Sequence, residues 1–336
     1  MTLKIGLVGA GAFGIIHLGG FSKNSNCQLV AIASRTEEHA KAASEKFKVP
    51  KIYSGNASWE KMLDNEELDV VSICTPNYLH APIILKALER NCHILCEKPI
   101  AISREELRQI ESELISKDLI FFTSFQKRYN PIFELLKAVI EDGILGKITL
   151  VRYYFSHFGP YKSWKSFSEE KWFFDSEKAG GGVLLDLGVH CIDILRFLLG
   201  DYENVSGINA NTSCINMGDE DNCNVLFRFK NDALGLISVS WCNEPAETID
   251  LFGTKGFIKV DLSGRIPISF GPKSLKSSES IEELLVFKPK YESAQNKLID
   301  HFINCVLTKK QANPSFIDGK KAVEFVLEAY SLKKKR

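Results

Sequence analysis

The stretch that decides the fold lies at the start of the chain and reads Leu3-Lys4-Ile5-Gly6-Leu7-Val8-Gly9-Ala10-Gly11-Ala12-Phe13-Gly14. A strand-like apolar run leads into a G-x-G-x-x-G pattern that opens a helix. The first glycine allows the tight turn, the second lets a pyrophosphate approach the backbone, and the third allows close helix–sheet packing. The helix N-terminus adds free N–H groups for phosphate. Residues Gly9, Ala10, Gly11, Ala12, Phe13 and Gly14 therefore predict a dinucleotide site, with a purely structural turn as the alternative.

The chain up to residue 126 alternates between two hydrophobic periods. Segments with helical spacing, such as Thr36–Phe47 and Arg104–Ser116, separate short apolar runs. Strands alternating with helices predict a doubly wound parallel sheet with right-handed crossovers, and so a Rossmann domain over residues 1–126. Its strands are expected to be buried on both faces. They are Leu3–Val8, Leu29–Ala33, Val70–Cys74, His93–Cys96 and Leu119–Thr123.

The pattern changes beyond residue 126. Between Asn204 and Leu262 several strand-like runs follow one another without intervening helices, which indicates an antiparallel sheet. The Gly253-Thr254-Lys255-Gly256 stretch is typical of a hairpin turn. Ser263–Glu282 has the composition of a loop, and two helical segments close the chain. The overall prediction is an α/β protein, with a second, α+β domain over residues 127–336 that contains a mainly antiparallel sheet.

Charge and composition exclude several classes of partner. Among 336 residues, 42 Lys and Arg balance 42 Asp and Glu. A nucleic-acid or anionic-membrane partner needs a basic excess, so we expect neither. No apolar run approaches the roughly 20 residues of a membrane helix, and the first residues lack the pattern of a signal peptide. We therefore expect a cytoplasmic protein.

The nine cysteines have no C-x-x-C pair and no repeated spacing. Disulfide frameworks belong to short secreted chains, and metal sites need closely spaced ligand pairs. Cys92, His93 and Cys96 invite a zinc interpretation, but they lie in one short strand-like run, which favours buried thiols. The sequence thus predicts reduced cysteines and no metal site.

Ser34-Arg35 occupies the end of the second predicted strand. NAD enzymes usually carry Asp or Glu there to bind the adenine ribose hydroxyls. Here the acid that would repel a 2′-phosphate is missing, and an arginine that could bind that phosphate is present. This favours NADP over NAD. The alternative is a solvated arginine and a relaxed choice of cofactor.

Two motifs follow neighbouring predicted strands. The first is Cys74-Thr75-Pro76-Asn77-Tyr78-Leu79-His80, and the second is Cys96-Glu97-Lys98-Pro99. In an open parallel sheet, ligands bind at the carboxyl ends of the strands. A lysine beside a nicotinamide could hydrogen-bond a substrate hydroxyl and stabilise a developing alkoxide. Either motif alone is a common solvated turn, so only the two motifs together indicate a ligand site.

Gly180-Gly181-Gly182 leads into a helical segment in which Asp186 and His190 lie four residues apart. On an α-helix this spacing places both side chains on one face, with Cβ atoms roughly 6 Å apart. Asp193 extends the face, although the neighbouring residues are apolar. Because buried polar groups need partners, the face predicts a reactive acid–imidazole pair or a structural histidine bonded to Asp193.

Together these motifs resemble the Gfo/Idh/MocA family of sugar and polyol oxidoreductases, and the resemblance spans nearly the whole chain. One departure is Trp172-Phe173, where many relatives have Trp-Arg before the triple glycine. The resemblance rests on the Gly9–Gly14 turn, Thr75-Pro76-Asn77 with His80, Glu97-Lys98-Pro99, Gly180-Gly181-Gly182 with Asp186, Gly188, His190 and Asp193, Gln126-Lys127-Arg128-Tyr129-Asn130-Pro131, and Asp318-Gly319 to Ala329-Tyr330.

The resemblance implies a catalytic set and a cofactor site. Lys98, Asp186 and His190 match the family's catalytic positions. Besides the glycine turn, Ser34 and Arg35, the positions expected to contact the cofactor are Thr75, Pro76, Asn77, His80, Glu97, Lys98 and Gln126. The cofactor expected from the whole pattern is NADP, with NAD possible.

The implied activity is hydride transfer between NAD(P)(H) and a secondary hydroxyl or keto carbon of a sugar, polyol or sugar derivative. One alternative is a non-sugar substrate of the dihydrodiol or tetrapyrrole type. Another is a non-catalytic dinucleotide sensor, although retention of Lys98, Asp186 and His190 favours an enzyme. The resemblance also implies an open sheet face in the second domain, through which a homodimer or homotetramer would form.

Overall fold

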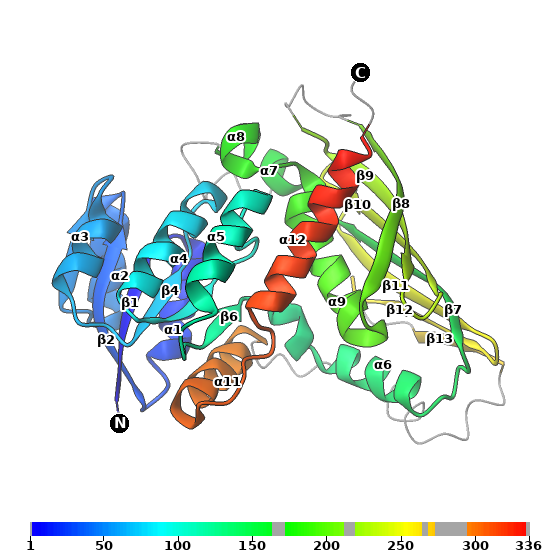
Figure 1. Cartoon of the computed structure of the whole chain (residues 1–336), viewed down its shortest axis with the longest axis horizontal. Coiled ribbons are helices and arrows are strands. Elements are labelled where there is room, and N and C mark those ends of the chain that lie inside the picture. The colour runs from blue at the N-terminus through cyan, green and yellow to red at the C-terminus, as the bar shows by residue number, and fades with distance from the viewer. Residues whose placement is uncertain (1, 163–171, 212–218, 264–267, 273–293, 334–336) are drawn as a thin grey trace. The chain divides into compact units, whose positions relative to one another are not determined.

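The computed structural model describes residues 2–162, 172–211, 219–263, 268–272 and 294–333. The chain packs into two compact units. The first unit comprises Met1–Gln126 and Glu292–Val323, and the second comprises Lys127–Tyr291 and Glu324–Arg336. Each unit has its own sheet (Figure 1).

The first unit contains a parallel sheet of six strands in the order β3-β2-β1-β4-β5-β6. Every neighbouring pair is parallel, and every residue of β4, β5 and β6 except His93 is buried. The order reverses beside β1, which confirms the doubly wound Rossmann sheet. The strands are β1 (Leu3–Val8), β2 (Cys27–Ser34), β3 (Lys51–Ser54), β4 (Val70–Ile73), β5 (His93–Cys96) and β6 (Phe121–Thr123).

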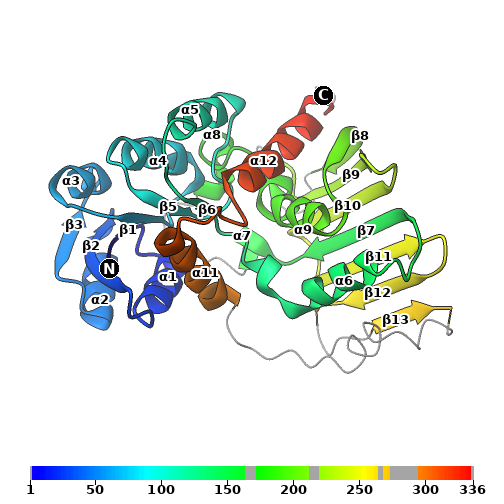
Figure 2. The same ribbon diagram turned by 60° about the horizontal axis from the view of Figure 1, so that its bottom comes forward.

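Helices cover both faces of this sheet. Figure 2 shows α3, α4 and α5 on one face and α1, α2 and α11 on the other. Ser103 caps α5, since its hydroxyl accepts the Glu106 N–H at 3.2 Å. The helices are α1 (Ala12–Phe21), α2 (Glu37–Phe47), α3 (Ser58–Asn65), α4 (His80–Glu89), α5 (Arg104–Leu114) and α11 (Ala294–Thr308).

The first unit includes a segment from near the end of the chain. The sequence pattern predicts that all residues after 126 belong to the second domain, whereas Glu292–Val323 belongs to the first unit. The reason is side-chain packing: Gly20 of α1 leaves room for Ile299 of α11, and a Cβ at Gly20 would overlap that side chain. Helix α12 (Phe316–Ser331) has residues in both units.

The second unit contains a seven-stranded sheet in the order β13-β12-β11-β7-β10-β9-β8. Only the β7–β10 pair is parallel, so the prediction of a mainly antiparallel sheet is confirmed. The expected hairpin joins β11 to β12, but β13 lies within the stretch that we interpreted as a loop. The strands are β7 (Ile148–Ser156), β8 (Tyr202–Asn211), β9 (Asn222–Phe229), β10 (Leu234–Ser240), β11 (Ala246–Gly253), β12 (Phe257–Asp261) and β13 (Ile268–Gly271).

Among the residues that the structure describes, one face of this sheet is covered and the other is open. Burial alternates along β9, where Phe227 and Phe229 are buried and Leu226 is 55% exposed. Helix α9 (Val189–Leu199) and the end of α12 lie against the buried face, and no helix drawn for the described residues covers the opposite face (Figure 1). Phe325 of α12 packs edge-on against Phe227. Two-residue periodicity therefore distinguishes the core face from the solvent face.

The remaining helices of the second unit are short or capped. Helix α6 (Pro131–Glu141) starts at Asn130, whose side-chain oxygen accepts the Ile132 N–H at 3.1 Å. Before α9 the chain forms α7 (Gly159–Lys162), η3 (Trp172–Phe174), α8 (Ser176–Ala179) and the π-helical turn η4 (Leu184–Gly188). Within the described residues, no helix is long and apolar enough to cross a membrane.

Candidate functional site

The glycine turn after β1 has the steric properties of a pyrophosphate-binding turn. Gly9 has φ +97°, and a Cβ there would lie 3.0 Å from the Thr75 nitrogen and overlap the Cys74 carbonyl. A Cβ at Gly14 would overlap the Gly9 carbonyl oxygen, whereas one at Gly11 would meet no atom within 4 Å. The first and third glycines are thus required by the fold, and the second leaves open space beside the backbone. These are the three roles that a dinucleotide turn needs.

Helix α1 begins at this turn with an N-terminus that no side chain caps. Its N-cap is Gly11, and its first turn carries no acidic residue. The first N–H groups of a helix have no intrahelical partner, so these donors and the helix dipole can receive a phosphate. Ala10 is buried and Phe13 is half exposed, so these two residues frame the turn. The arrangement fits a dinucleotide.

The end of β2 carries no acidic side chain. Ser34 is 8% exposed, and Arg35 is exposed just beyond it. The backbone carbonyl of Arg35 accepts the Gly55 N–H at 3.1 Å, which fixes this strand end. The next acid is Glu37, in the first turn of α2, where it forms an exposed ion pair with Lys41. The preference for NADP stays a prediction.

The two motifs after β4 and β5 lie side by side at the carboxyl edge of the same sheet. The Cys74 N–H donates to the Val8 carbonyl at 2.8 Å, and the Glu97 N–H donates to the Ile73 carbonyl at 2.9 Å. Residues Thr75 and Pro76 lead into the turn η1 (Asn77–Leu79), and all three of Thr75, Pro76 and Asn77 are half-buried. The fold thus brings the glycine turn and both motifs to one edge.

His80 joins these two loops to each other. Its ring is 1% exposed, with Nδ1 2.7 Å from the Pro99 carbonyl oxygen and Nε2 2.8 Å from the Thr75 carbonyl oxygen. Burial lowers the pKa of His80, although both carbonyl contacts oppose that shift. The ring faces the protein backbone, so its expected contribution to cofactor binding would be made through the loop that it holds.

Glu97 also faces inward. It is 5% exposed, and its Oε1 lies 2.7 Å from the Ser124 hydroxyl and 3.0 Å from His17 Nε2. Burial by itself raises the pKa of Glu97, but hydrogen bonds from His17 and Ser124 and the charges of His17 and Lys98 bring it below its ordinary value. The Glu97 carboxylate is therefore bonded within the first unit, and the expected contact of Glu97 with the cofactor stays a prediction.

Lys98 and Gln126 are both half-buried residues of the first unit. Lys98 lies between the buried residues Glu97 and Pro99, just after the end of β5. Gln126 opens the turn η2 (Gln126–Tyr129), and its side-chain oxygen has no hydrogen-bond partner among the described residues. An amide oxygen without a partner is suited to receive a donor from a bound ligand.

The triple glycine of the second unit is required by close packing. A Cβ at Gly182 would overlap the Glu220 carbonyl, and one at Gly181 would overlap the Tyr330 ring. The Tyr330 hydroxyl accepts the Gly182 N–H at 3.2 Å and donates to the buried carboxylate of Glu220 at 2.7 Å. Glu220 and Tyr330 therefore fix the start of the segment that carries Asp186.

Asp186 lies in a π-helical turn, which changes the geometry that we expected. The turn Leu184–Gly188 precedes α9, so Asp186 and His190 do not share one continuous α-helix. Asp186 Oδ2 accepts the indole N–H of Trp241 at 3.1 Å, and His190 is 5% exposed. Isolated π turns are rare and are frequent at functional sites. The sequence pattern did not reveal the role of Trp241, which lies 55 residues from Asp186 along the chain.

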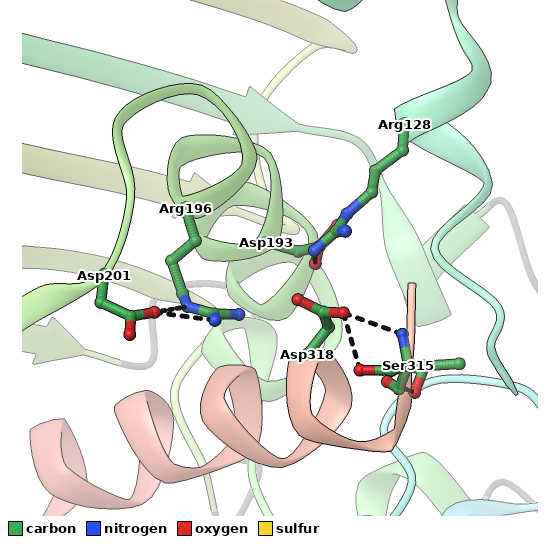
Figure 3. Close-up of polar contacts among 7 residues, drawn as sticks. Arg128, Asp193, Arg196, Asp201, Ser315 and Asp318 are labelled. Atoms are coloured by element: carbon green, nitrogen blue, oxygen red, sulfur yellow. Dashed lines mark hydrogen bonds and ion pairs between the residues drawn. The ribbon is translucent and has the colours of Figure 1, made fainter. Parts of the chain in front are cut away.

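Asp193 has a structural partner that the sequence analysis missed. Arg128 donates to it twice, through Nε at 2.9 Å and Nη2 at 2.6 Å, and both side chains are almost fully buried (Figure 3). Arg196 forms a similar pair with Asp201 near the end of α9. The same figure shows the Ser315 backbone N–H and hydroxyl donating to Asp318 near the start of α12. Asp193 thus binds a guanidinium that anchors α9.

The cysteines bring no metal set together. Among the described residues, no group of three or more His, Cys, Asp or Glu side chains could hold a metal ion. Cys92 and Cys96 are buried and donate to backbone carbonyls of Leu68 and Glu97, each at 3.2 Å. Cys242 is disulfide-bonded, which corrects the expectation of a free thiol at that position.

Two family models match the chain. Residues 3–125 match the oxidoreductase family with an NAD-binding Rossmann fold, and residues 133–259 match the GFO/IDH/MocA C-terminal domain. Together the matches cover most of the Rossmann unit and most of the sheet of the second unit.

Relatives and solved structures are similar over most of the chain. Myo-inositol 2-dehydrogenase of Thermotoga maritima is 25% identical over 99% of this chain and 96% of its own. Trans-1,2-dihydrobenzene-1,2-diol dehydrogenase of Bos taurus is 28% identical over 77% of this chain and 74% of its own. The structure of the WlbA dehydrogenase from Bordetella pertussis, in complex with NADH and UDP-GlcNAcA, superposes with a TM-score of 0.84 at 24% identity. This match covers 98% of this chain and 95% of that one. That likeness shows a common fold.

Proposed function

The chain belongs to the Gfo/Idh/MocA family of oxidoreductases, and from this we propose a dehydrogenase that uses NAD(P)(H). The reaction proposed is hydride transfer to or from a secondary hydroxyl or keto carbon of a sugar, polyol or sugar derivative. The observation that carries the proposal is the glycine turn, whose Gly11 leaves space for a pyrophosphate while Gly9 and Gly14 pack tightly. Lys98 lies on the same sheet edge as that turn.

For the cofactor we propose a preference for NADP(H). Ser34 offers no carboxylate to a ribose 2′-hydroxyl, and exposed Arg35 can meet a 2′-phosphate. NAD is the second candidate, favoured by the NADH complex of the similar WlbA dehydrogenase. Changing Arg35 to Ala should weaken NADPH binding about tenfold or more, because a charge-assisted contact is lost, and leave NADH binding nearly unchanged. Equal losses for both nucleotides would contradict the preference.

In the proposed mechanism each candidate catalytic side chain has one task. A bound nicotinamide supplies or accepts the hydride. His190 takes the substrate hydroxyl proton during oxidation and returns it during reduction, and a positioned base of this kind contributes about 10²- to 10⁴-fold. Lys98 donates to the reacting oxygen and stabilises its developing charge. Asp186 binds a neighbouring substrate hydroxyl, with its carboxylate oriented by Trp241.

The substrate class is a sugar or polyol in the first instance, by analogy with the inositol dehydrogenase of Thermotoga maritima. The similarity to bovine trans-1,2-dihydrobenzene-1,2-diol dehydrogenase supports a second candidate, a trans-dihydrodiol. Phe173 is buried and packs against the rings of Trp172 and Phe174. It occupies the position of the arginine that we expect in the Trp-Arg pair of many relatives. This position therefore supplies no guanidinium that could bind an anionic substrate group.

A substrate panel tests the proposed function. Inositols, sugars, nucleotide sugars and trans-dihydrodiols should be assayed with NADP and NAD by nicotinamide absorbance. We expect turnover with at least one sugar or polyol, and loss of turnover in Lys98→Ala and His190→Ala with nucleotide affinity retained. Tight nucleotide binding without any turnover would contradict the proposal and favour a sensor.

For assembly we propose that the open sheet face of the second unit pairs with another copy in a homodimer or homotetramer. Leu226 of β9 and Leu234 of β10 are 55% and 50% exposed on this sheet. Exposed apolar side chains that cluster on one face often mark an interface. Light scattering should show an oligomer that Leu226→Glu disrupts, whereas a wild-type monomer would contradict the proposal. A cytoplasmic location stays a prediction.

A further inference from the structure

The two chain neighbours of Lys98 are each held by a buried histidine. His17 contacts the side chain of Glu97, which precedes Lys98, and His80 contacts the carbonyl of Pro99, which follows it. The exposed fractions of these histidines are 0% and 1%, so neither ring is available to bind a ligand directly from solvent. Both contacts lie within the first unit.

The His17 contact fixes a buried carboxylate. His17 Nε2 lies 3.0 Å from Glu97 Oε1, and its Nδ1 lies 2.8 Å from the Ser72 hydroxyl on β4. The Ser124 hydroxyl, just after β6, reaches the same Glu97 oxygen at 2.7 Å. The side-chain amide nitrogen of Gln295, on α11, donates to Ser124 Oγ at 3.1 Å. A buried carboxylate is costly unless it is paired, so this cluster leaves Glu97 little freedom.

The His80 contact joins the two loops at the sheet edge. Carbonyl oxygens only accept, so each ring nitrogen must carry a proton to bond its neighbour. The neutral ring donates to one of the Thr75 and Pro99 carbonyls and lies against the other, whereas the imidazolium form, which burial disfavours, donates to both. Thr75 in turn packs beside Gly9, so His80 ties the loop of Lys98 to the loop next to the glycine turn.

We propose that His17 and His80 are positioning residues that hold Lys98 for hydride transfer. The lysine side chain is flexible, and two fixed chain neighbours restrict where its ammonium group can reach. Misplacing a catalytic group by about 1 Å can lower the rate about 10²-fold. This inference rests on the proposed catalytic role of Lys98. The competing explanation is that both histidines only satisfy buried polar groups and stabilise the fold.

The first test compares kinetics with stability. In His17→Ala and His80→Ala we expect kcat for the best substrate of the panel to fall about 10- to 100-fold, because Lys98 is released. In His17→Ala the dissociation constant of NADPH, measured by its fluorescence, should change less than about threefold, since the glycine turn is intact. His80 also holds the Thr75 loop, so kcat of His80→Ala is compared with the wild type at saturating NADPH. His80→Gln restores an N–H donor and should recover part of the lost kcat. If the Ala variants do not fold, Ser124→Ala, which removes one bond to Glu97, should show a smaller loss of the same kind.

His93→Ala is the matched control. His93 lies at the opposite end of β5, where its Nδ1 accepts the Ile120 N–H at 2.9 Å. Its removal also takes a histidine hydrogen bond from the first unit, but far along the strand from Lys98. We expect His93→Ala to lower the melting temperature with kcat unchanged. Equal kcat losses in the control and in the His17 and His80 variants would overturn the inference.

A double-mutant cycle separates this inference from the proposed function. In a Lys98→Met background, measured by single-turnover nicotinamide absorbance at high enzyme concentration, adding His17→Ala or His80→Ala should lower the rate less than about twofold. The full loss in that background would overturn the positioning role. Wild-type turnover of Lys98→Met alone would instead refute the catalytic role of Lys98.

Crystal structures give a readout that needs no substrate. The Lys98 backbone should move by about 1 Å or become disordered in the His17→Ala and His80→Ala variants, and stay in place in His93→Ala. An unmoved, well-ordered Lys98 in both histidine variants would overturn the inference.

Discussion

The glycine turn allows nucleotide binding to be separated from folding with two alanine substitutions. At Gly11 an added Cβ meets no protein atom within 4 Å, and φ is −74°, which suits alanine. At Gly14 an added Cβ would overlap the Gly9 carbonyl oxygen and lie 3.0 Å from the Gly9 carbonyl carbon and 3.3 Å from Leu7 Cδ2. The same methyl group is therefore harmless to the fold at one position and forbidden at the other.

The magnitudes follow from these surroundings. Gly14→Ala forces backbone atoms apart, and overpacking of this kind costs about 1–3 kcal/mol. For a unit of this size that lowers the melting temperature by roughly 2–12 °C, at about 2–4 °C per kcal/mol. Gly11→Ala should cost less than about 1 kcal/mol, because the position is open but alanine is a poorer N-cap than glycine. Its methyl group occupies the space that we assign to the pyrophosphate, so NADPH affinity should fall at least about tenfold, or about 1.4 kcal/mol.

Two measurements on the same protein preparations are enough. Thermal unfolding without nucleotide gives the stability change, and NADPH fluorescence titration gives the dissociation constant. The reasoning is refuted if Gly11→Ala binds NADPH as the wild type does, because the pyrophosphate then lies elsewhere. It is also refuted if Gly11→Ala loses as much stability as Gly14→Ala.

Three further predictions concern single contacts. Trp241→Phe removes the indole N–H that donates to Asp186, so kcat/KM should fall about tenfold, the equivalent of about 1.4 kcal/mol, with NADPH affinity retained. An unchanged kcat/KM would mean that Trp241 does not orient the Asp186 carboxylate. Arg128→Met leaves the buried Asp193 carboxylate without its bidentate partner and should cost about 3–5 kcal/mol in urea unfolding, whereas a loss below about 1 kcal/mol would contradict our account of this pair. Because the pKa of His80 is lowered in the folded chain, the unfolded chain takes up a proton first as pH falls below about 6.5, and the free energy of unfolding declines there. This decline should be shallower in His80→Gln. Identical pH profiles of stability in the two proteins would argue against the lowered pKa.

Local patterns were sufficient to predict the Rossmann unit. Residues Leu3–Gly14 contain a strand, a turn and a helix start within twelve positions, and the spacing of Gly9, Gly11 and Gly14 is that of a dinucleotide turn. Alternating periods predicted the parallel sheet, and the strand-rich second half predicted the mainly antiparallel one, because both depend on burial along a single segment. Thr75 and Lys98 could be placed at one sheet edge, since parallel strands share their carboxyl ends.

The tertiary structure alone decided which side chains meet. His17 reaches Glu97 across 80 residues of sequence, Trp241 reaches Asp186 across 55, and Arg128 reaches Asp193 across 65. No spacing rule links such pairs, because the partners come from separate elements whose packing sets the distance.

The sequence also did not predict which unit the closing segment belongs to, or that Asp186 lies in a π turn. Ile299 packs against Gly20 and brings Glu292–Val323 into the first unit, although that segment follows the whole second sheet in the chain. Asp186 and His190 are four residues apart in the sequence whether their segment forms an α-helix or contains a π turn. Only the backbone hydrogen-bond pattern distinguishes the two structures. The sequence by itself determined the Rossmann unit, the mainly antiparallel sheet and the dinucleotide turn, because these follow from local sterics and periodicity. The contacts that orient the candidate catalytic groups depend on distant residues, so only the packed structure decided them.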